Sequence, residues 1–191
     1  MVGSVRMRRT IDASSPPSSP VLNNAGVWLP FGTTSLQLVD ANTIQGAPNQ
    51  EQFYQFVQPY TITIGHVTFA IGTGLAGSLF GVALYSGDGT QKLTAADGVS
   101  TATAGNKRPA LSSVITLIAD ATYWIGWTGT DNVTVTILNF LESTFQASIR
   151  NQSVTRSGRS TTATAGGVTL ATVNNVIAGV QLRIPEFYFD L

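Results

Sequence analysis

The chain has no cysteine and few charged side chains. Asp, Glu, Lys and Arg make up 10% of its 191 residues, against about 25% in a typical soluble protein. The absence of cysteine excludes disulfides, thiolate nucleophiles and zinc–thiolate sites. The formal net charge is zero, so no broad positive surface is available for phosphates and nucleic-acid binding is disfavoured. A surface poor in charge is weakly protected against self-association, which favours a place in an assembly.

Long apolar runs are also missing. The most apolar window, Val114–Trp127, contains Asp120 and is shorter than the roughly 20 residues that a membrane helix needs. The basic residues near the N-terminus are followed by polar, proline-rich sequence, so we expect no signal peptide. We therefore expect neither a membrane span nor a membrane partner.

Groups that carry catalysis are sparse. The single histidine, His66, lies within a strand pattern, and no Gly-x-Ser-x-Gly motif accompanies it, so a serine triad is not indicated. Most carboxylates stand beside Gly, Asn or Ala in turn-like sequence, apart from Glu51 and Glu186, which does not favour the acid pair of a glycosidase. Asp88 stands in a Gly-Asp-Gly turn without the spacing of a calcium loop. We predict no catalytic residue, no metal and no cofactor.

The first 32 residues differ in composition from the rest of the chain. They hold a basic cluster and then the run Ser14–Pro20, which favours an extended, polyproline-like backbone and cannot build a core. A solvated tail is the ordinary fate of such a segment; an arm that binds a partner is the other possibility. The arm residues expected to touch a partner are Arg6, Arg8, Arg9, Pro16, Pro17 and Pro20, with Trp28 and Phe31 as an apolar plug where the arm meets the domain.

Residues 33–191 carry β patterns throughout, with no convincing helical periodicity. A slip in the alternation at Gly65-His66 indicates a bulge, and Ser86–Gly89 indicates a hairpin turn. We expect the two strands on either side of Ala119–Ala121 to pair with each other. The predicted strands are Leu36–Val39, Gln52–Gln58, Thr61–Ile71, Leu79–Tyr85, Val99–Thr103, Ser113–Ile118, Thr122–Thr128, Val133–Leu138, Phe145–Ile149, Val168–Val173 and Val180–Phe189. Recurrent short strands separated by turns favour one all-β domain, an antiparallel, jelly-roll-like sandwich.

One strand concentrates aromatic side chains. Tyr123, Ile125 and Trp127 share one face of it, and Trp124 lies on the other, because side chains alternate along a strand. Core packing accounts best for Tyr123 and Trp127. Trp124 is left to contact a loop, a partner or a ligand such as a glycan.

A second basic segment follows the predicted strands of the first half. Arg150, Arg156 and Arg159 occur with no acidic residue between Glu142 and Glu186. A solvated loop would have this composition. A loop that contacts an acidic neighbour in an assembly would have it too.

About half of the chain resembles a known family. Residues 50–140 are similar to a β-sandwich module that recurs in virion proteins of tailed bacteriophages. At the last matching position, family versions usually carry Gly-Thr-Tyr-Tyr-Leu-Ala where this chain has Ala-Thr-Tyr-Trp-Ile-Gly. The residues that carry the resemblance are the aromatic strand Gln52–Val57, Ile62-x-Ile64 leading to Val67-x-Phe69, Gly77-Ser78-Leu79-x-x-Val82-x-Leu84-Tyr85-x-x-Asp88-Gly89, and Ala121-x-Tyr123-Trp124-Ile125.

The resemblance implies a structural role in a virion. The module is similar to parts of tail fibres, carbohydrate-binding modules and capsid cement proteins, and a short chain with an extended arm looks most like a cement (decoration) protein. Such a protein would be made in the host cytoplasm, form a homotrimer on the capsid surface and bind the major capsid protein. The alternative is a tail-fibre or baseplate module that recognises host glycans through its loops and Trp124.

Overall fold

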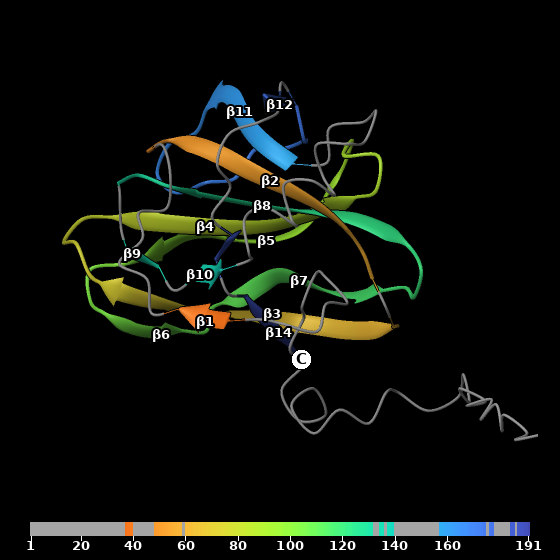
Figure 1. Cartoon of the computed structure of the whole chain (residues 1–191), viewed down its shortest axis with the longest axis horizontal. Helices are drawn as coiled ribbons and strands as arrows, with labels where there is room; N and C mark the ends of the chain where they lie inside the picture. Colours follow the sequence, from red (N-terminus) through yellow and green to blue (C-terminus); the bar gives the residue numbers. More distant parts are fainter. Residues whose placement is uncertain are drawn as a thin grey trace, which may run out of the picture.

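The computed structural model describes residues 37–39, 48–58, 60–131, 134–135, 137–139, 157–174, 176–177, 184–185 and 187–191. All regular structure within these ranges is β-strand. No helix in the described part of the chain is long and apolar enough to cross a membrane. The predicted all-β class is confirmed, and the antiparallel sheets pack together as a sandwich (Figure 1).

One layer of the sandwich is a six-stranded antiparallel sheet (Figure 1). In spatial order, its strands are β12 (Val176–Ile177), β11 (Ser157–Ala163), β2 (Gln50–Val57), β8 (Thr122–Gly129), β4 (Leu79–Ser86) and β5 (Lys92–Ser100).

The opposite layer is organised around the long strand β3. This strand pairs with β14, β6, β7 and β9, all antiparallel. A small third sheet joins β1, β10 and β13. The bounds are β3 (Ile62–Thr73), β14 (Tyr188–Asp190), β6 (Gly105–Lys107), β7 (Ala110–Leu117), β9 (Thr134–Val135), β1 (Gln37–Val39), β10 (Ile137–Asn139) and β13 (Ile184–Pro185).

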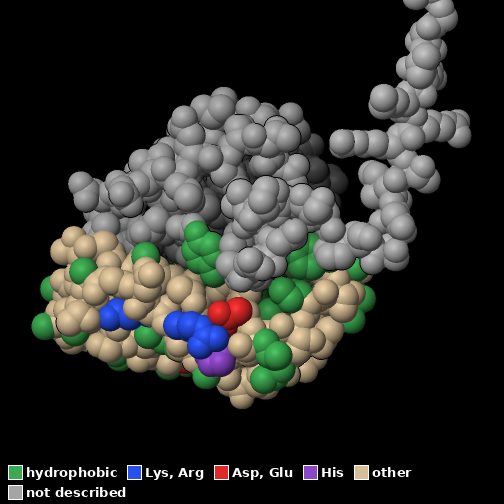
Figure 2. Space-filling view, turned by 90° about the horizontal axis from the view of Figure 1, so that it is seen from below, with side chains coloured by type: hydrophobic (Ala, Val, Ile, Leu, Met, Phe, Trp, Pro, Cys, Tyr) green, Lys and Arg blue, Asp and Glu red, His purple; other side chains and the backbone are tan. Residues whose placement is uncertain are grey.

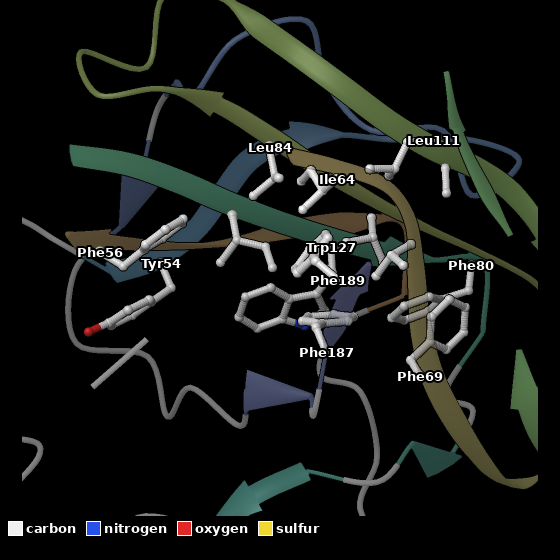
Figure 3. Close-up of a cluster of buried hydrophobic side chains, with 14 of the residues drawn as sticks. Tyr54, Phe56, Ile64, Phe69, Phe80, Leu84, Leu111, Trp127, Phe187 and Phe189 are labelled. Carbon is white, nitrogen blue, oxygen red and sulfur yellow. The ribbon is translucent and has the colours of Figure 1, made fainter. Parts of the chain in front are cut away.

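The core fills the space between the two layers (Figure 3). Because successive side chains point to opposite faces of a strand, β4 places Phe80, Val82 and Leu84 in the core and β8 places Ile125 and Trp127 there. The opposite layer contributes Ile64, Val67, Phe69 and Ile71 from β3, Leu111 and Leu117 from β7, and Phe187 and Phe189 from the C-terminal segment. The prediction that Tyr123, Ile125 and Trp127 share a face, with Trp124 on the other, is confirmed.

The predicted hairpin between Ser113–Ile118 and Thr122–Thr128 is wrong. Strand β7 pairs with β3, whereas β8 pairs with β2 and β4. The turn at Asp120, whose φ is 61°, therefore crosses from one layer to the other. Two backbone bonds join the turn to Gln58, the residue after β2: the Asp120 N–H donates to the Gln58 carbonyl at 2.8 Å, and the Gln58 N–H donates to the Ala121 carbonyl at 2.9 Å. Both strands have a strongly apolar face, which predicts burial but does not identify the strand alongside.

Other predicted elements differ in extent. The bulge at Gly65-His66 is confirmed by a register shift between Ile64 and His66. Strand β5 begins at Lys92, well before the predicted start at Val99. Its first half contains Ala95 and Ala96, and the strand signal there is weak because alanine is depleted in strands. Residues Gly105–Lys107 form the short strand β6, which is not among the strands predicted from the sequence. The predicted arm and Phe145–Ile149 lie outside the described residues.

Candidate functional site

The six-stranded sheet carries a second hydrophobic cluster on the face turned away from the core. It consists of Phe53, Ala83, Tyr85, Ala95 and Trp124, with Leu170 and Val173 packed against it. Leu170 and Val173 belong to residues 164–174, which we name the strap. We predicted a strand over Val168–Val173; the strap has only an isolated bridge between Ala165 and Val168. It lies across the sheet instead of adding a strand to it.

Glycines on the sheet allow the strap backbone to come close. A Cβ atom at Gly81 would collide with the Gly167 carbonyl oxygen, and one at Gly126 would collide with the Glu51 carboxyl group. Gly167 itself has a φ of 65°, a conformation that side chains rarely allow. Backbone bonds then join the strap to the hairpin β4–β5: Gly98 N–H donates to Gly167 O at 3.0 Å, and Val173 N–H donates to Gly89 O at 2.8 Å.

A fully buried carboxyl group holds the centre of the strap. Glu51 on β2 has 0% of its surface exposed. Its Oε2 accepts the Leu170 N–H at 2.6 Å, and its Oε1 lies 2.6 Å from the Tyr85 hydroxyl. The same hydroxyl lies 2.9 Å from the Leu170 carbonyl oxygen. Glu51 and Tyr85 therefore engage both backbone groups of Leu170, as a neighbouring strand would.

Burial shifts the titration of both side chains. Desolvation raises the pKa of Glu51 to about 8, against the lowering effects of the bonds to Tyr85 and Leu170. Desolvation, followed by the charge that Glu51 would carry, raises the pKa of Tyr85 above its usual range. Burial therefore favours the neutral form of the carboxyl group and the protonated form of the hydroxyl.

A charged pair holds the strap one residue earlier. Lys92 Nζ lies 3.3 Å from Asp97 Oδ2 and donates to Thr169 O and Oγ1, both at 3.1 Å. Asp97 Oδ1 in turn accepts the Thr169 N–H and hydroxyl, each at 2.8 Å. Thr169 thus joins Lys92 and Asp97 of β5 to the strap.

The single histidine belongs to a cluster in the opposite layer. Arg108 makes a two-pronged contact with Asp190, from Nε to Oδ2 at 3.0 Å and from Nη2 to Oδ1 at 2.9 Å. His66 Nδ1 lies 3.8 Å from Asp190 Oδ1. Figure 2 shows basic, acidic and histidine side chains side by side on this face. The pairing of Asp190 with His66 belongs to the β14–β3 register, so the cluster fastens the C-terminal strand to its neighbours.

The described acidic side chains that the sequence singled out, Glu51 and Asp88, are engaged within the fold. No three His, Cys, Asp or Glu side chains within it are grouped to hold a metal ion. Glu51 is covered by the strap and its carboxyl oxygens are engaged by Tyr85 and Leu170. Asp88 is taken up by its own turn, where its Oδ1 accepts the Ser86 hydroxyl at 2.5 Å and the Thr90 N–H at 3.0 Å.

Trp124 does not present an open ring. Only 7% of its surface is exposed, and its indole N–H donates to the Gly87 carbonyl at 3.1 Å. Stacking on a sugar requires an exposed ring face. Trp124 instead packs in the second cluster, and its indole N–H holds the β4–β5 turn. Of the loop, partner and ligand contacts that the sequence left open, the structure shows the loop contact.

Of the partner-binding residues predicted from the sequence, only Arg159 is described. It lies in strand β11, opposite Gln52 of β2 and Ile177 of β12, so the expectation of a loop at this position is wrong. Its Nε atom is buried without a hydrogen-bond partner in the described part of the chain. Residues Arg6, Arg8, Arg9, Pro16, Pro17, Pro20, Trp28, Phe31, Arg150 and Arg156 lie outside the described residues.

Sequence reasoning missed the role of Glu51. Its one signal was a carboxylate two positions before Phe53, on the same face of a strand. That signal was ambiguous, because the covering residue, Leu170, lies 119 positions away.

No protein-family model, curated protein or solved structure matches the chain.

Proposed function

We propose that this chain is a structural virion protein, a capsid cement (decoration) protein that binds the outer surface of the major capsid protein shell. The proposal rests on the resemblance carried by residues 50–140. Those residues include the strands β2, β3, β4 and β8, which build both layers of the sandwich. The sandwich is the scaffold that the resemblance implies.

The observation that carries the proposal is the use made of charged side chains. Most of those in the described part of the chain are engaged in contacts that hold the fold together, and no three His, Cys, Asp or Glu side chains among the described residues are grouped to hold a metal ion. This favours a structural protein over an enzyme. The engaged side chains are Glu51, Asp88, Lys92, Asp97, Lys107, Arg108, Asp131 and Asp190.

Binding would come from the segments whose sequence differs from the sandwich. The guanidinium groups of Arg6, Arg8 and Arg9 suit carboxylates of the major capsid protein. The Ser/Pro run suits an extended path over that surface. In a homotrimer the arm would be repeated at each symmetric site, so that several weak contacts add to a firm attachment. The basic residues Arg150, Arg156 and Arg159 would support that contact.

Location and copy number in purified particles test the proposal. Quantitative mass spectrometry and electron cryomicroscopy should find the protein at high copy number on the head, at threefold positions. A few copies at the tail tip would contradict the proposal and favour the receptor-binding alternative. That alternative loses its expected ring platform, because Trp124 is buried.

Variants of the arm test the mechanism. Removing residues 1–25, or replacing Arg6, Arg8 and Arg9 with Ser in the full-length chain, should leave the circular dichroism of the sandwich unchanged and abolish head decoration. Replacing Arg150 and Arg156 with Ser tests the second basic segment separately and should weaken decoration less. Full occupancy by the truncated protein would overturn the role of the arm.

A further inference from the structure

The hydrogen bonds that join Glu51 and Tyr85 to Leu170 need one more proton than Tyr85 and the Leu170 N–H supply. A protonated Glu51 carboxyl group would supply it. The Tyr85 hydroxyl has one proton to donate and two acceptors in range, Glu51 Oε1 at 2.6 Å and the Leu170 carbonyl at 2.9 Å. With Glu51 ionised, one of these buried acceptors loses its bond. With Glu51 protonated, its O–H donates to Tyr85, Tyr85 donates to Leu170 O, and the Leu170 N–H donates to Oε2. Every buried group then has a partner, as buried polar groups require.

The described groups around Glu51 offer no free counter-charge for its ionised form. On the strands β4 and β5, the facing titratable groups are Tyr85, Lys92 and Asp97. Lys92 is already paired with Asp97 and bonded to Thr169. On the neighbouring strand β8, this face carries the uncharged Trp124 and Gly126.

The described residues of β11 and of the strap do not supply a charge either. Arg159 of β11 is the register partner of Gln52, so the alternation of side chains places it on the other face of the sheet from Glu51. From the strap, only the backbone of Leu170 reaches the carboxyl group. An ionised Glu51 would therefore be a buried charge, with no opposite charge among the described residues free to neutralise it.

We infer that the strap, residues 164–174, is a latch closed by the proton that Glu51 shares with Tyr85, and that it loosens from the sheet when this proton is lost. Gly81, which leaves room for the Gly167 carbonyl, and the Lys92–Asp97 pair, which binds Thr169, would guide the strap back to the same place. Opening exposes Glu51 to water and uncovers the apolar cluster of Phe53, Tyr85 and Trp124.

The direction of the pH dependence follows from the two states of the strap. In the open state Glu51 is solvated and titrates in its ordinary range, near 4.5, whereas in the closed state its pKa is about 8. Between these values the open state releases a proton that the closed state retains. The equilibrium constant for opening therefore rises by up to about tenfold per pH unit from about pH 5 to 8, and becomes constant above that.

Hydrogen exchange of the full-length chain tests the latch. We would measure protection factors of the strap amides, Leu170 above all, from pH 5 to 9. Protection factors already remove the intrinsic pH dependence of exchange. The wild-type strap should lose protection by up to about tenfold per pH unit to pH 8 and then level off. At each pH its amides should also be less protected than those of β8, because the strap opens without unfolding of the sandwich.

Glu51→Gln is the matched variant. Its amide nitrogen can donate to Tyr85 and its oxygen can accept from Leu170. Both hydrogen bonds of the side chain at position 51 therefore remain, and this side chain no longer titrates. Its strap should stay protected at every pH. Equal pH dependence in Glu51→Gln and the wild type would overturn the latch, as would equal protection of the strap and β8. If the variant does not fold, the ¹³C shift of the Glu51 carboxyl carbon can be followed against pH in the wild type. Titration of this carboxyl group in its ordinary range, near 4.5, with the strap still protected would also overturn the latch.

Discussion

A single acidic residue sets much of the chemistry of this sandwich. Glu51 is fully buried and engages both backbone groups of Leu170, directly and through the Tyr85 hydroxyl. The folded state holds its proton up to about pH 8, whereas the unfolded chain releases it near pH 4.5. Between these values the unfolded state binds fewer protons, so the free energy of unfolding falls as the pH rises. The contribution of Glu51 is complete below pH 4.5 and is lost progressively up to about pH 8.

We expect denaturant unfolding to show this loss. From pH 5 to 8 the wild type should lose free energy of unfolding on the order of 4 kcal/mol more than Glu51→Gln, since each pH unit is worth about 1.4 kcal/mol. Other titrating groups are common to both proteins and cancel in the comparison. Parallel pH profiles for the two proteins would show that Glu51 titrates alike in the folded and unfolded states.

At the scale of an element, the strap shows how a β-like sequence is used without forming a strand. Leu170 and Val173 pack on the second cluster, whereas Thr169 is tied to the charged pair of β5. The sheet beneath has glycines at the points where the backbones meet. The strap is therefore held by side chains of the sheet and by isolated backbone bonds, and lacks the regular ladder of a strand.

Removing the Thr169 hydroxyl should weaken this attachment. Thr169→Val keeps the shape of the side chain and deletes one bond to Asp97 and one to Lys92. Bonds to charged groups are worth about 1.5–3 kcal/mol, so we expect a loss of that size in the free energy of unfolding, measured by denaturant titration. Thr116→Val is the control. The Thr116 hydroxyl of β7 is exposed and contacts the uncharged hydroxyl of Thr63 on β3. A loss as large in the control would contradict the role of the charged pair.

At the scale of the whole molecule, residues from the end of the chain complete the core. Phe187 and Phe189 lie between the layers, with the Phe187 ring 6.1 Å from that of Trp127 and 6.3 Å from that of Phe69 (Figure 3). Strand β14, which contains Phe189, pairs with β3, and Arg108 fastens the strand through Asp190. The two layers are therefore joined by residues far apart in the sequence.

Substituting an inward residue of this segment should cost far more than substituting its outward neighbour. Phe189→Ala removes a buried ring that is 2% exposed, and we expect a loss of about 3–5 kcal/mol in the free energy of unfolding. Tyr188→Ala, on the half-buried alternate face, should cost less. Thermal and denaturant unfolding of the two variants would measure the difference. Equal losses would mean that the C-terminal strand contributes mainly through its backbone pairing.

The sequence by itself determined the properties that depend on neighbouring residues. Alternation fixed which side chains of β8 face the core, and its slip located the bulge of β3 at Gly65-His66. These signals are strong because side chains alternate with a period of two along any strand. The all-β class follows from the same local patterns.

Only the tertiary structure decided what lies opposite each face. It placed β7 and β8 in different layers, buried Trp124 beneath the strap and left Glu51 with Tyr85 and Leu170 as its partners. The physical reason is distance along the chain. Pairing and burial depend on contacts between residues many positions apart, and an apolar or polar face has the same local pattern whichever distant segment covers it.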